Sequence, residues 1–115
     1  MAQKIIFTRK KANKYRARKT VLDGIKFDSE KEAKRYFELK ILERNGLIAE
    51  LERQVKFRIE INGVKICDFI ADFQYVQNGE IIVEDVKSEA TRKIPAYRLK
   101  NKLMLAVWGI RIKET

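Results

Sequence analysis

The stretch "ADFQYVQNGEIIVEDVK", from Ala71 to Lys87, decides the fold because it reads as two strands joined by a tight turn. Apolar and aromatic residues fill both halves, and Asn78-Gly79 separates them. Asn-Gly is strongly preferred in two-residue hairpin turns, in which both central residues have positive φ. The stretch therefore predicts an antiparallel hairpin whose register is set by its turn.

That register brings two acidic residues face to face. Counting outward from the turn places Asp72 opposite Asp85. Directly opposed residues share a face of the sheet, with Cβ atoms about 5 Å apart. Lys87 points to the same face, where the count places it opposite Ile70, and Asp68 lies further along that face.

Like charges in opposed positions destabilise a sheet, so the acidic pair needs a compensating positive charge. Lys87 supplies part of it, and a divalent cation between Asp72 and Asp85 supplies more, because Mg²⁺ prefers carboxylate oxygens. The alternative is a solvated strand end with a salt bridge to Lys87, and the hairpin alone leaves both interpretations open. Glu84 points to the other face, toward Phe73, where we expect a structural role.

A helix is predicted from the segment "SEKEAKRYFELKILERNG", which begins at Ser29 and ends at Gly46. Ser29 caps its start, Glu32 completes a capping box, and Gly46 ends the helix. Glu32 lies at the edge of the apolar stripe, so it either packs over the sheet face as a third carboxylate or serves only as the cap. The predicted stripe consists of Ala33, Tyr36, Phe37 and Ile41.

Two further segments extend the sheet. "QVKFRIEI" (residues 54–61) alternates apolar and polar residues, as a half-buried strand does. Asn62-Gly63 follows as another two-residue turn and leads into "VKICDFIADFQYV" (residues 64–76). Asp23-Gly24 gives a weaker hairpin signal ahead of the helix.

The last part of the chain predicts a second helix and a closing strand, "WGIRIKE". Pro95 stands near the helix start, where its missing N–H is harmless. The order helix, three antiparallel strands, helix, strand indicates an α/β fold with a central mixed sheet. We expect one domain over residues 21–115, preceded by a basic arm in residues 1–20. The residues expected to line the buried side of the second helix are Tyr97, Leu99, Leu103, Met104 and Val107.

The charge distribution indicates a polyanionic partner. The chain of 115 residues has a net charge of +10, with +8 in residues 1–20, −4 in residues 21–86 and +6 in residues 87–115. Basic ends favour nucleic acid, although a basic tail on an unrelated domain gives the same count. Carboxylates in the centre suit such a partner if metal ions lie between them and phosphate.

Two absences narrow the function. The chain has no histidine, which excludes histidine general bases and zinc sites of the Cys/His kind. It has a single cysteine, Cys67, and no apolar run long enough to span a membrane or to act as a signal peptide. We therefore expect an intracellular protein that is not embedded in a membrane.

Asp72 followed by Asp85-Val86-Lys87 resembles the D…(D/E)xK signature of the PD-(D/E)xK nuclease superfamily. From about residue 20 to residue 110, "FDSEKEAKRYFELK", "LERQVKF" and "ADFQYV…IIVEDVKS" are similar to small phage-encoded nucleases of that superfamily. They are more distantly similar to the TnsA transposase endonuclease subunit and to archaeal-type Holliday junction resolvases. The chain departs from the common pattern at Asp85, where many members have Glu, and at Ala71, where the motif has Pro.

The resemblance implies a restriction-endonuclease-like fold and an endodeoxyribonuclease that depends on Mg²⁺ or Mn²⁺. Its DNA substrates would include branched or recombining DNA such as Holliday junctions. Asp72 and Asp85 would bind the metal, Glu32 would bind the same or a second ion, and Lys87 would orient or activate the attacking water. Gln54 also matches a glutamine of related patterns, but the register points it to the other face of the sheet.

Basic side chains are expected to hold the DNA backbone, although an ordinary solvated helix face has the same composition. A homodimer is expected, since one site cuts one strand. The competing functions are a non-catalytic nucleic-acid-binding domain with a degenerate site and a structural or regulatory protein. The candidate DNA contacts are Lys10, Lys11, Arg16 and Arg18 of the arm, and Lys93, Arg98, Lys100 and Lys102 of the second helix.

Overall fold

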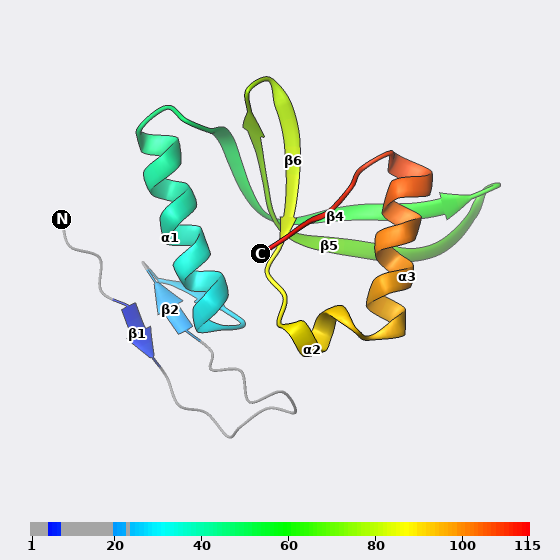
Figure 1. The fold of residues 1–115 in the computed structure, drawn as a ribbon, viewed down its shortest axis with the longest axis horizontal. Helices are drawn as coiled ribbons and strands as arrows, with labels where there is room; N and C mark the ends of the chain where they lie inside the picture. The colour runs from blue at the N-terminus through cyan, green and yellow to red at the C-terminus, as the bar shows by residue number, and fades with distance from the viewer. Residues whose placement is uncertain (1–4, 8–19, 23) are drawn as a thin grey trace. The chain divides into compact units, whose positions relative to one another are not determined.

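The computed structural model describes residues 5–7, 20–22 and 24–115. Most of the predicted basic arm, including its candidate DNA contacts at positions 10, 11, 16 and 18, lies outside these residues. The chain divides into two compact units, Met1–Ile41 and Leu42–Thr115. Helix α1 (Glu30–Arg44), drawn in Figure 1, lies in the first unit up to Ile41, and its last three residues belong to the second.

A three-stranded antiparallel sheet and most of α1, up to Ile41, form the described part of the first unit. Leu22 pairs with Ile25 across a two-residue loop, which confirms the hairpin predicted from Asp23-Gly24. Phe27 and Ala33 are buried together, and the Phe27 ring lies 5.3 Å from that of Tyr36. The strands are β1 (Ile5–Phe7), β2 (Thr20–Leu22) and β3 (Ile25–Phe27).

Helix α1 begins and ends where the sequence predicts. Ser29 Oγ accepts the Glu32 backbone N–H at 3.1 Å, as an N-cap does. Gly46 has a φ of 72° and donates to the Glu43 carbonyl, while Leu47 donates to the carbonyl five residues before it at 2.9 Å. These two bonds form a Schellman motif, which ends the helix.

The predicted apolar stripe of α1 is wrong in part. Leu39 is fully buried, whereas Phe37 is 36% exposed and Ile41 is 40% exposed. Leu39 follows Glu32 by two full turns and shares its buried face, and Ile41 is rotated about 200° further around the helix. The buried face therefore includes Glu32 itself, which is 3% exposed.

The second unit contains a mixed four-stranded sheet, as the order of predicted elements indicated. Its first three strands are antiparallel, and the last is parallel to its neighbour. Both Asn-Gly turns have positive φ at each residue, which is the type I′ geometry. In order across the sheet, the strands are β4 (Ala49–Ile61), β5 (Val64–Gln77), β6 (Glu80–Asp85) and β7 (Lys113–Glu114).

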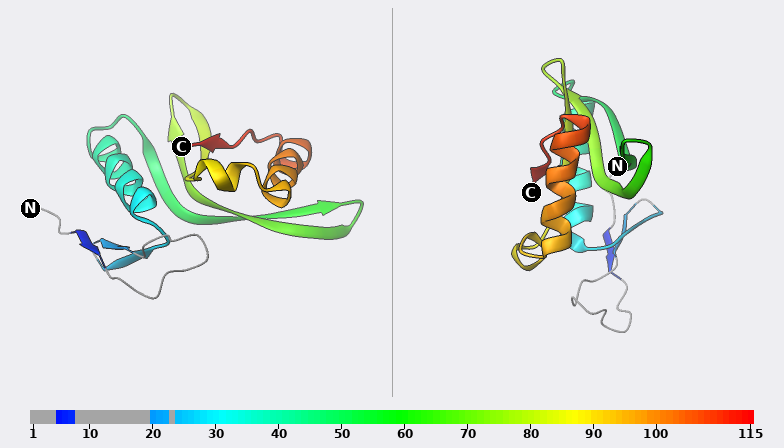
Figure 2. Two further views of the ribbon diagram at one scale, coloured as in Figure 1. Left: turned by 60° about the horizontal axis from the view of Figure 1, so that its bottom comes forward. Right: turned by 90° about the vertical axis from the view of Figure 1, so that its right-hand side faces the viewer.

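Helical segments connect β6 to β7, as the parallel pairing of these strands requires. α3 lies across one face of the β4–β5 hairpin, whose turn projects beyond the helix (Figure 2). Trp108 Nε1 donates to the Arg58 carbonyl at 2.9 Å and fixes the end of the connection to β4. The segments are α2 (Glu89–Arg92), α3 (Pro95–Leu103) and the π-helical turn η1 (Met104–Trp108).

The core of this unit lies between the hairpin and the helical connection. Two residues of the predicted buried side are exposed instead, Leu99 at 57% and Val107 at 37%. Leu99 is rotated about 200° from Tyr97, which packs on the core. Of the helices in the described residues, none is long and apolar enough to cross a membrane. The buried cluster consists of Phe57, Ile59, Phe69, Ala71, Val83 and Met104.

Ile59→Ala should destabilise the protein by about 2–5 kcal/mol, because Ile59 is fully buried and the lost methyl groups leave a cavity. The matched control is Ile61→Ala, which removes the same atoms from a residue of the same strand that is 41% exposed. Urea unfolding should show a markedly smaller loss for the control. Equal losses at the two positions would contradict this assignment of the core.

Candidate functional site

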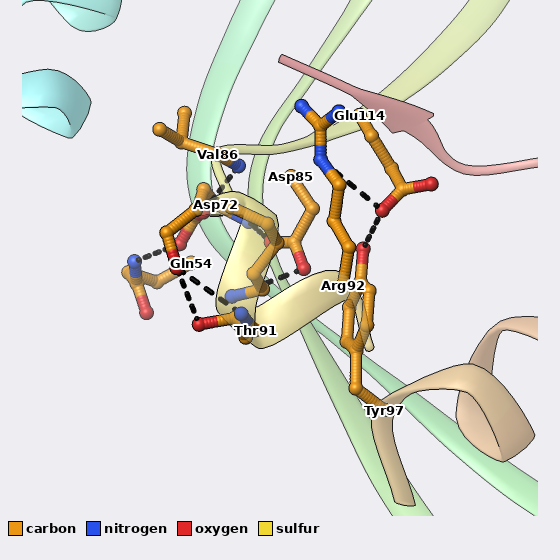
Figure 3. Close-up of polar contacts among 10 residues, drawn as sticks. Gln54, Asp72, Asp85, Val86, Thr91, Arg92, Tyr97 and Glu114 are labelled. Atoms are coloured by element: carbon orange, nitrogen blue, oxygen red, sulfur yellow. Dashed lines mark hydrogen bonds and ion pairs between the residues drawn. The ribbon is translucent and has the colours of Figure 1, made fainter. Parts of the chain in front are cut away.

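Asp72 in β5 and Asp85 at the end of β6 lie side by side, as the turn register predicts. The Asp72 backbone N–H donates to Asp85 Oδ1 at 3.2 Å, and the Val86 N–H donates to Asp72 Oδ2 at 2.8 Å (Figure 3). These bonds continue the pairing of the two strands beyond the last ladder pair, Phe73 with Glu84. Asp72 is 8% exposed and Asp85 is 1% exposed, so two buried carboxylates are held in fixed orientations.

Lys87 joins this pair from beyond the strand. Its Nζ lies 3.2 Å from Asp85 Oδ2 and 5.6 Å from the centre of the Tyr97 ring. The predicted pairing of Lys87 with Ile70 is wrong, because β6 ends at Asp85 and the Lys87 backbone N–H donates to Thr115 at 3.1 Å. The three residues predicted as the centre of the site are nevertheless brought together.

Tyr97 has a place at the site that the sequence did not reveal. Its hydroxyl donates to Glu114 Oε2 at 3.1 Å, and Arg92 Nε lies 3.8 Å from the same oxygen (Figure 3). Burial raises the pKa of Tyr97, so the hydroxyl keeps its proton at neutral pH. Helix α3 and strand β7 therefore meet beside the Lys87 ammonium, on which the Tyr97 ring exerts a cation–π attraction.

Gln54 also contacts Asp72. The prediction that its side chain points to the other face of the sheet is therefore wrong. A count of residues outward from the Asn62-Gly63 turn places Gln54 opposite Ala71. In the structure, however, Ile66 is left unpaired, and the strand register shifts there by one residue. A shift of one residue moves a side chain to the other face of a sheet. Gln54 therefore stands opposite Asp72, and its Nε2 donates to Asp72 Oδ1 at 3.5 Å.

Two neighbouring acids have partners of their own. Asp68 lies 2.9 Å from Lys65 and 3.4 Å from Lys56, and the hydrogen bond from Lys65 lowers its pKa. Glu84 is fully buried and accepts the Tyr75 hydroxyl at 2.8 Å, in line with the structural role expected for it. Both acids are thus accounted for by contacts outside the Asp72–Asp85 pair.

The remaining predicted site residues stand apart from these contacts. Glu32 is buried in the first turn of α1 and belongs to the first unit, so its part in the site stays a prediction. Among the basic residues, Lys93, Arg98 and Lys102 are exposed and Lys100 is half-buried. Their contact with DNA also stays a prediction.

Burial, followed by the neighbouring Asp72 carboxylate, raises the pKa of Asp85 to about 7, against the opposing effect of Lys87. The pair therefore carries more negative charge than Lys87 neutralises when both acids are ionised. Each carboxylate oxygen accepts one contact from the protein and has a further lone pair. Two carboxylates completed by water suit a hard cation such as Mg²⁺ or Mn²⁺.

This donor set is small. Across the described ranges of the chain, no three Asp, Glu, Cys or His side chains gather into a group that could hold a metal ion. Mg²⁺ is commonly held through one or two carboxylates and keeps several waters, so the pair alone meets its needs. The residues present fit a divalent cation that is only partly ligated by protein.

Together, the fold and the site define an α/β protein with a buried acidic pair and a lysine at the end of a central hairpin. Residues 12–111 match the family described as "Protein of unknown function (DUF1064)". The match spans most of the chain, so the protein belongs to the DUF1064 family. No curated protein and no solved structure matches it.

In EDTA, Asp85→Asn should become more stable relative to the wild type as the pH rises from about 4 to about 7. The raised pKa means that the folded state holds the Asp85 proton more tightly than the unfolded chain, so the wild-type unfolding free energy falls across this window. The expected relative change is roughly 2–4 kcal/mol by urea unfolding.

Asp68→Asn is the control for this measurement. The pKa of Asp68 is lowered, so its carboxylate stabilises the fold above the unfolded pKa and its removal gives no gain with rising pH. Parallel pH profiles for the wild type and Asp85→Asn would contradict the raised pKa.

Proposed function

We propose that this protein is a metal-dependent endodeoxyribonuclease of the PD-(D/E)xK type, with a restriction-endonuclease-like fold. The observation that carries the proposal is the contact of Asp72, Asp85 and Lys87 at the end of one hairpin. Their order along the chain resembles the superfamily signature, and their geometry supplies the groups that phosphodiester hydrolysis needs. Burying two carboxylates beside a lysine also costs free energy, which would be unusual at a strand end with no function.

Asp72 and Asp85 would hold Mg²⁺ or Mn²⁺ between them. When bound, the cation supplies charge neutralisation at the phosphate and acidifies the attacking water. The backbone N–H groups of Asp72 and Val86 fix one oxygen of each carboxylate, so the pair needs little rearrangement to bind. As part of the same proposal, Glu32 would bind this ion or a second one.

Lys87 would act on the reacting phosphate. Its ammonium lies between Asp85 and the Tyr97 ring, and only a quarter of its side chain is exposed. A positive charge held in a site with little water stabilises the negative charge that develops during phosphoryl transfer. Because its Nζ lies 3.2 Å from Asp85 Oδ2, the same group would orient or help to activate the attacking water.

The proposed substrate is DNA, including branched or recombining forms, inside a cell. Lys93, Arg98, Lys100 and Lys102, together with the basic arm, would contact its phosphates. One site cuts one strand, so cutting both strands of a duplex or junction favours a homodimer. A nucleic-acid-binding domain without catalysis remains the other outcome of the test below.

Purified protein should cut linear, nicked or four-way-junction DNA with Mg²⁺ or Mn²⁺ and should stop in EDTA. Asp72→Asn and Lys87→Met should each reduce the cleavage rate by at least about 100-fold, because each removes a charge from the reacting centre. Asp68→Asn, which removes an acid with its own lysine partners, should cut at the wild-type rate.

DNA binding should be followed in the same samples by gel shift. Binding without metal-dependent cleavage of any substrate would identify a non-catalytic binding domain. Cleavage that survives in Asp72→Asn and Lys87→Met would place the active site elsewhere.

A further inference from the structure

Gln54 has a backbone conformation that its place in the sheet does not explain. Its φ is 51°, in the left-handed region that residues other than glycine seldom occupy. Glu50, in the same strand, has a φ of 56° but lies within a register shift, where a bulge accounts for it. Gln54 instead lies between two pairs in the same register, Arg53 with Phe73 and Val55 with Ala71.

The conformation is also not explained by packing, since Gln54 is an exposed residue. Strained residues persist where the surrounding structure enforces them, and they gather at functional sites. A contact that accompanies this strain is the hydrogen bond from Gln54 Nε2 to Asp72 Oδ1 (Figure 3). That contact therefore offers a functional reason for the strained backbone.

The bond from Gln54 completes the restraint on Asp72. Val86 N–H holds Oδ2 at 2.8 Å, and the Gln54 amide contacts Oδ1, so both carboxylate oxygens have a donor. A neutral amide suits this position, because a carboxylate there would add a third negative charge beside Asp72 and Asp85. A basic residue there would compete with a cation for Asp72.

We infer that Gln54 is a positioning residue, which holds the Asp72 carboxylate in the orientation that binds a divalent cation with Asp85. The part of this inference that concerns the cation rests on the proposed function. The coupling of Gln54 to Asp72 does not depend on it. Removing a hydrogen-bond partner that orients a metal-binding side chain typically lowers metal affinity by about 10–100-fold.

The test uses two variants of Gln54 and one matched control. Gln54→Met keeps the length of the side chain and removes the donor, while Gln54→Gly removes the donor and relieves the strained φ. Glu50→Gly relieves the same kind of strain in the same strand without touching Asp72. Titration calorimetry with Mn²⁺ should show at least a tenfold loss of affinity for both Gln54 variants and none for Glu50→Gly.

Thermal unfolding separates positioning from a structural role. Gln54→Gly should unfold at or above the wild-type temperature, as Glu50→Gly should, and yet bind Mn²⁺ more weakly. Wild-type Mn²⁺ affinity in both Gln54 variants would overturn the inference. The same result would leave the proposed nuclease function standing, because the wild type would still bind metal.

A readout without metal covers the case in which the wild type binds no Mn²⁺ and the proposed function fails. The Gln54 side-chain amide resonances, identified by their loss in Gln54→Gly, should move in Asp72→Asn and stay in place in Asp68→Asn. Resonances that are unmoved in Asp72→Asn would overturn the coupling between Gln54 and Asp72. Resonances that move support it whether or not the protein cuts DNA.

Discussion

The contact between Asp72 and Asp85 is the constraint on which the rest of the second unit depends. Asp85 accepts the backbone N–H of Asp72 in β5, and Asp72 accepts that of Val86, directly after β6. The two acids therefore replace main-chain pairing where the strands part. The ionised form of Asp85 is disfavoured here, because burial and then the neighbouring Asp72 carboxylate raise its pKa. The two-residue Asn78-Gly79 turn fixes the strand register, which keeps the two acids opposite each other.

The helical connection from β6 to β7, and the chain end that follows it, supply residues that contact Lys87. Because β7 runs parallel to β6, the chain must cross over through α2, α3 and η1 before it returns. That crossover brings Tyr97 under the ammonium and Glu114 against the Tyr97 hydroxyl, and Thr115 accepts the Lys87 backbone N–H. Core packing and the candidate site are thus built by the same elements.

Features that follow from a turn motif, such as hairpin register, could be predicted from the sequence. Features that follow from an unpaired residue within a strand could not. An Asn-Gly turn determines its own hairpin register, so the opposition of Asp72 and Asp85 could be counted from the residues. The extra residue at Ile66 carries no comparable signal, and it moved Gln54 to the opposite side from the one predicted. The contribution of Glu32 depends on long-range placement of α1, which no turn register determines.

We propose that a divalent cation binds between Asp72 and Asp85. The most direct measurement is X-ray diffraction from crystals soaked in Mn²⁺, with data collected for anomalous scattering. We expect an anomalous peak at about 2.0–2.3 Å from oxygens of both carboxylates, with the remaining positions filled by water. No peak at this pair, or a peak bound only by other residues, would contradict it.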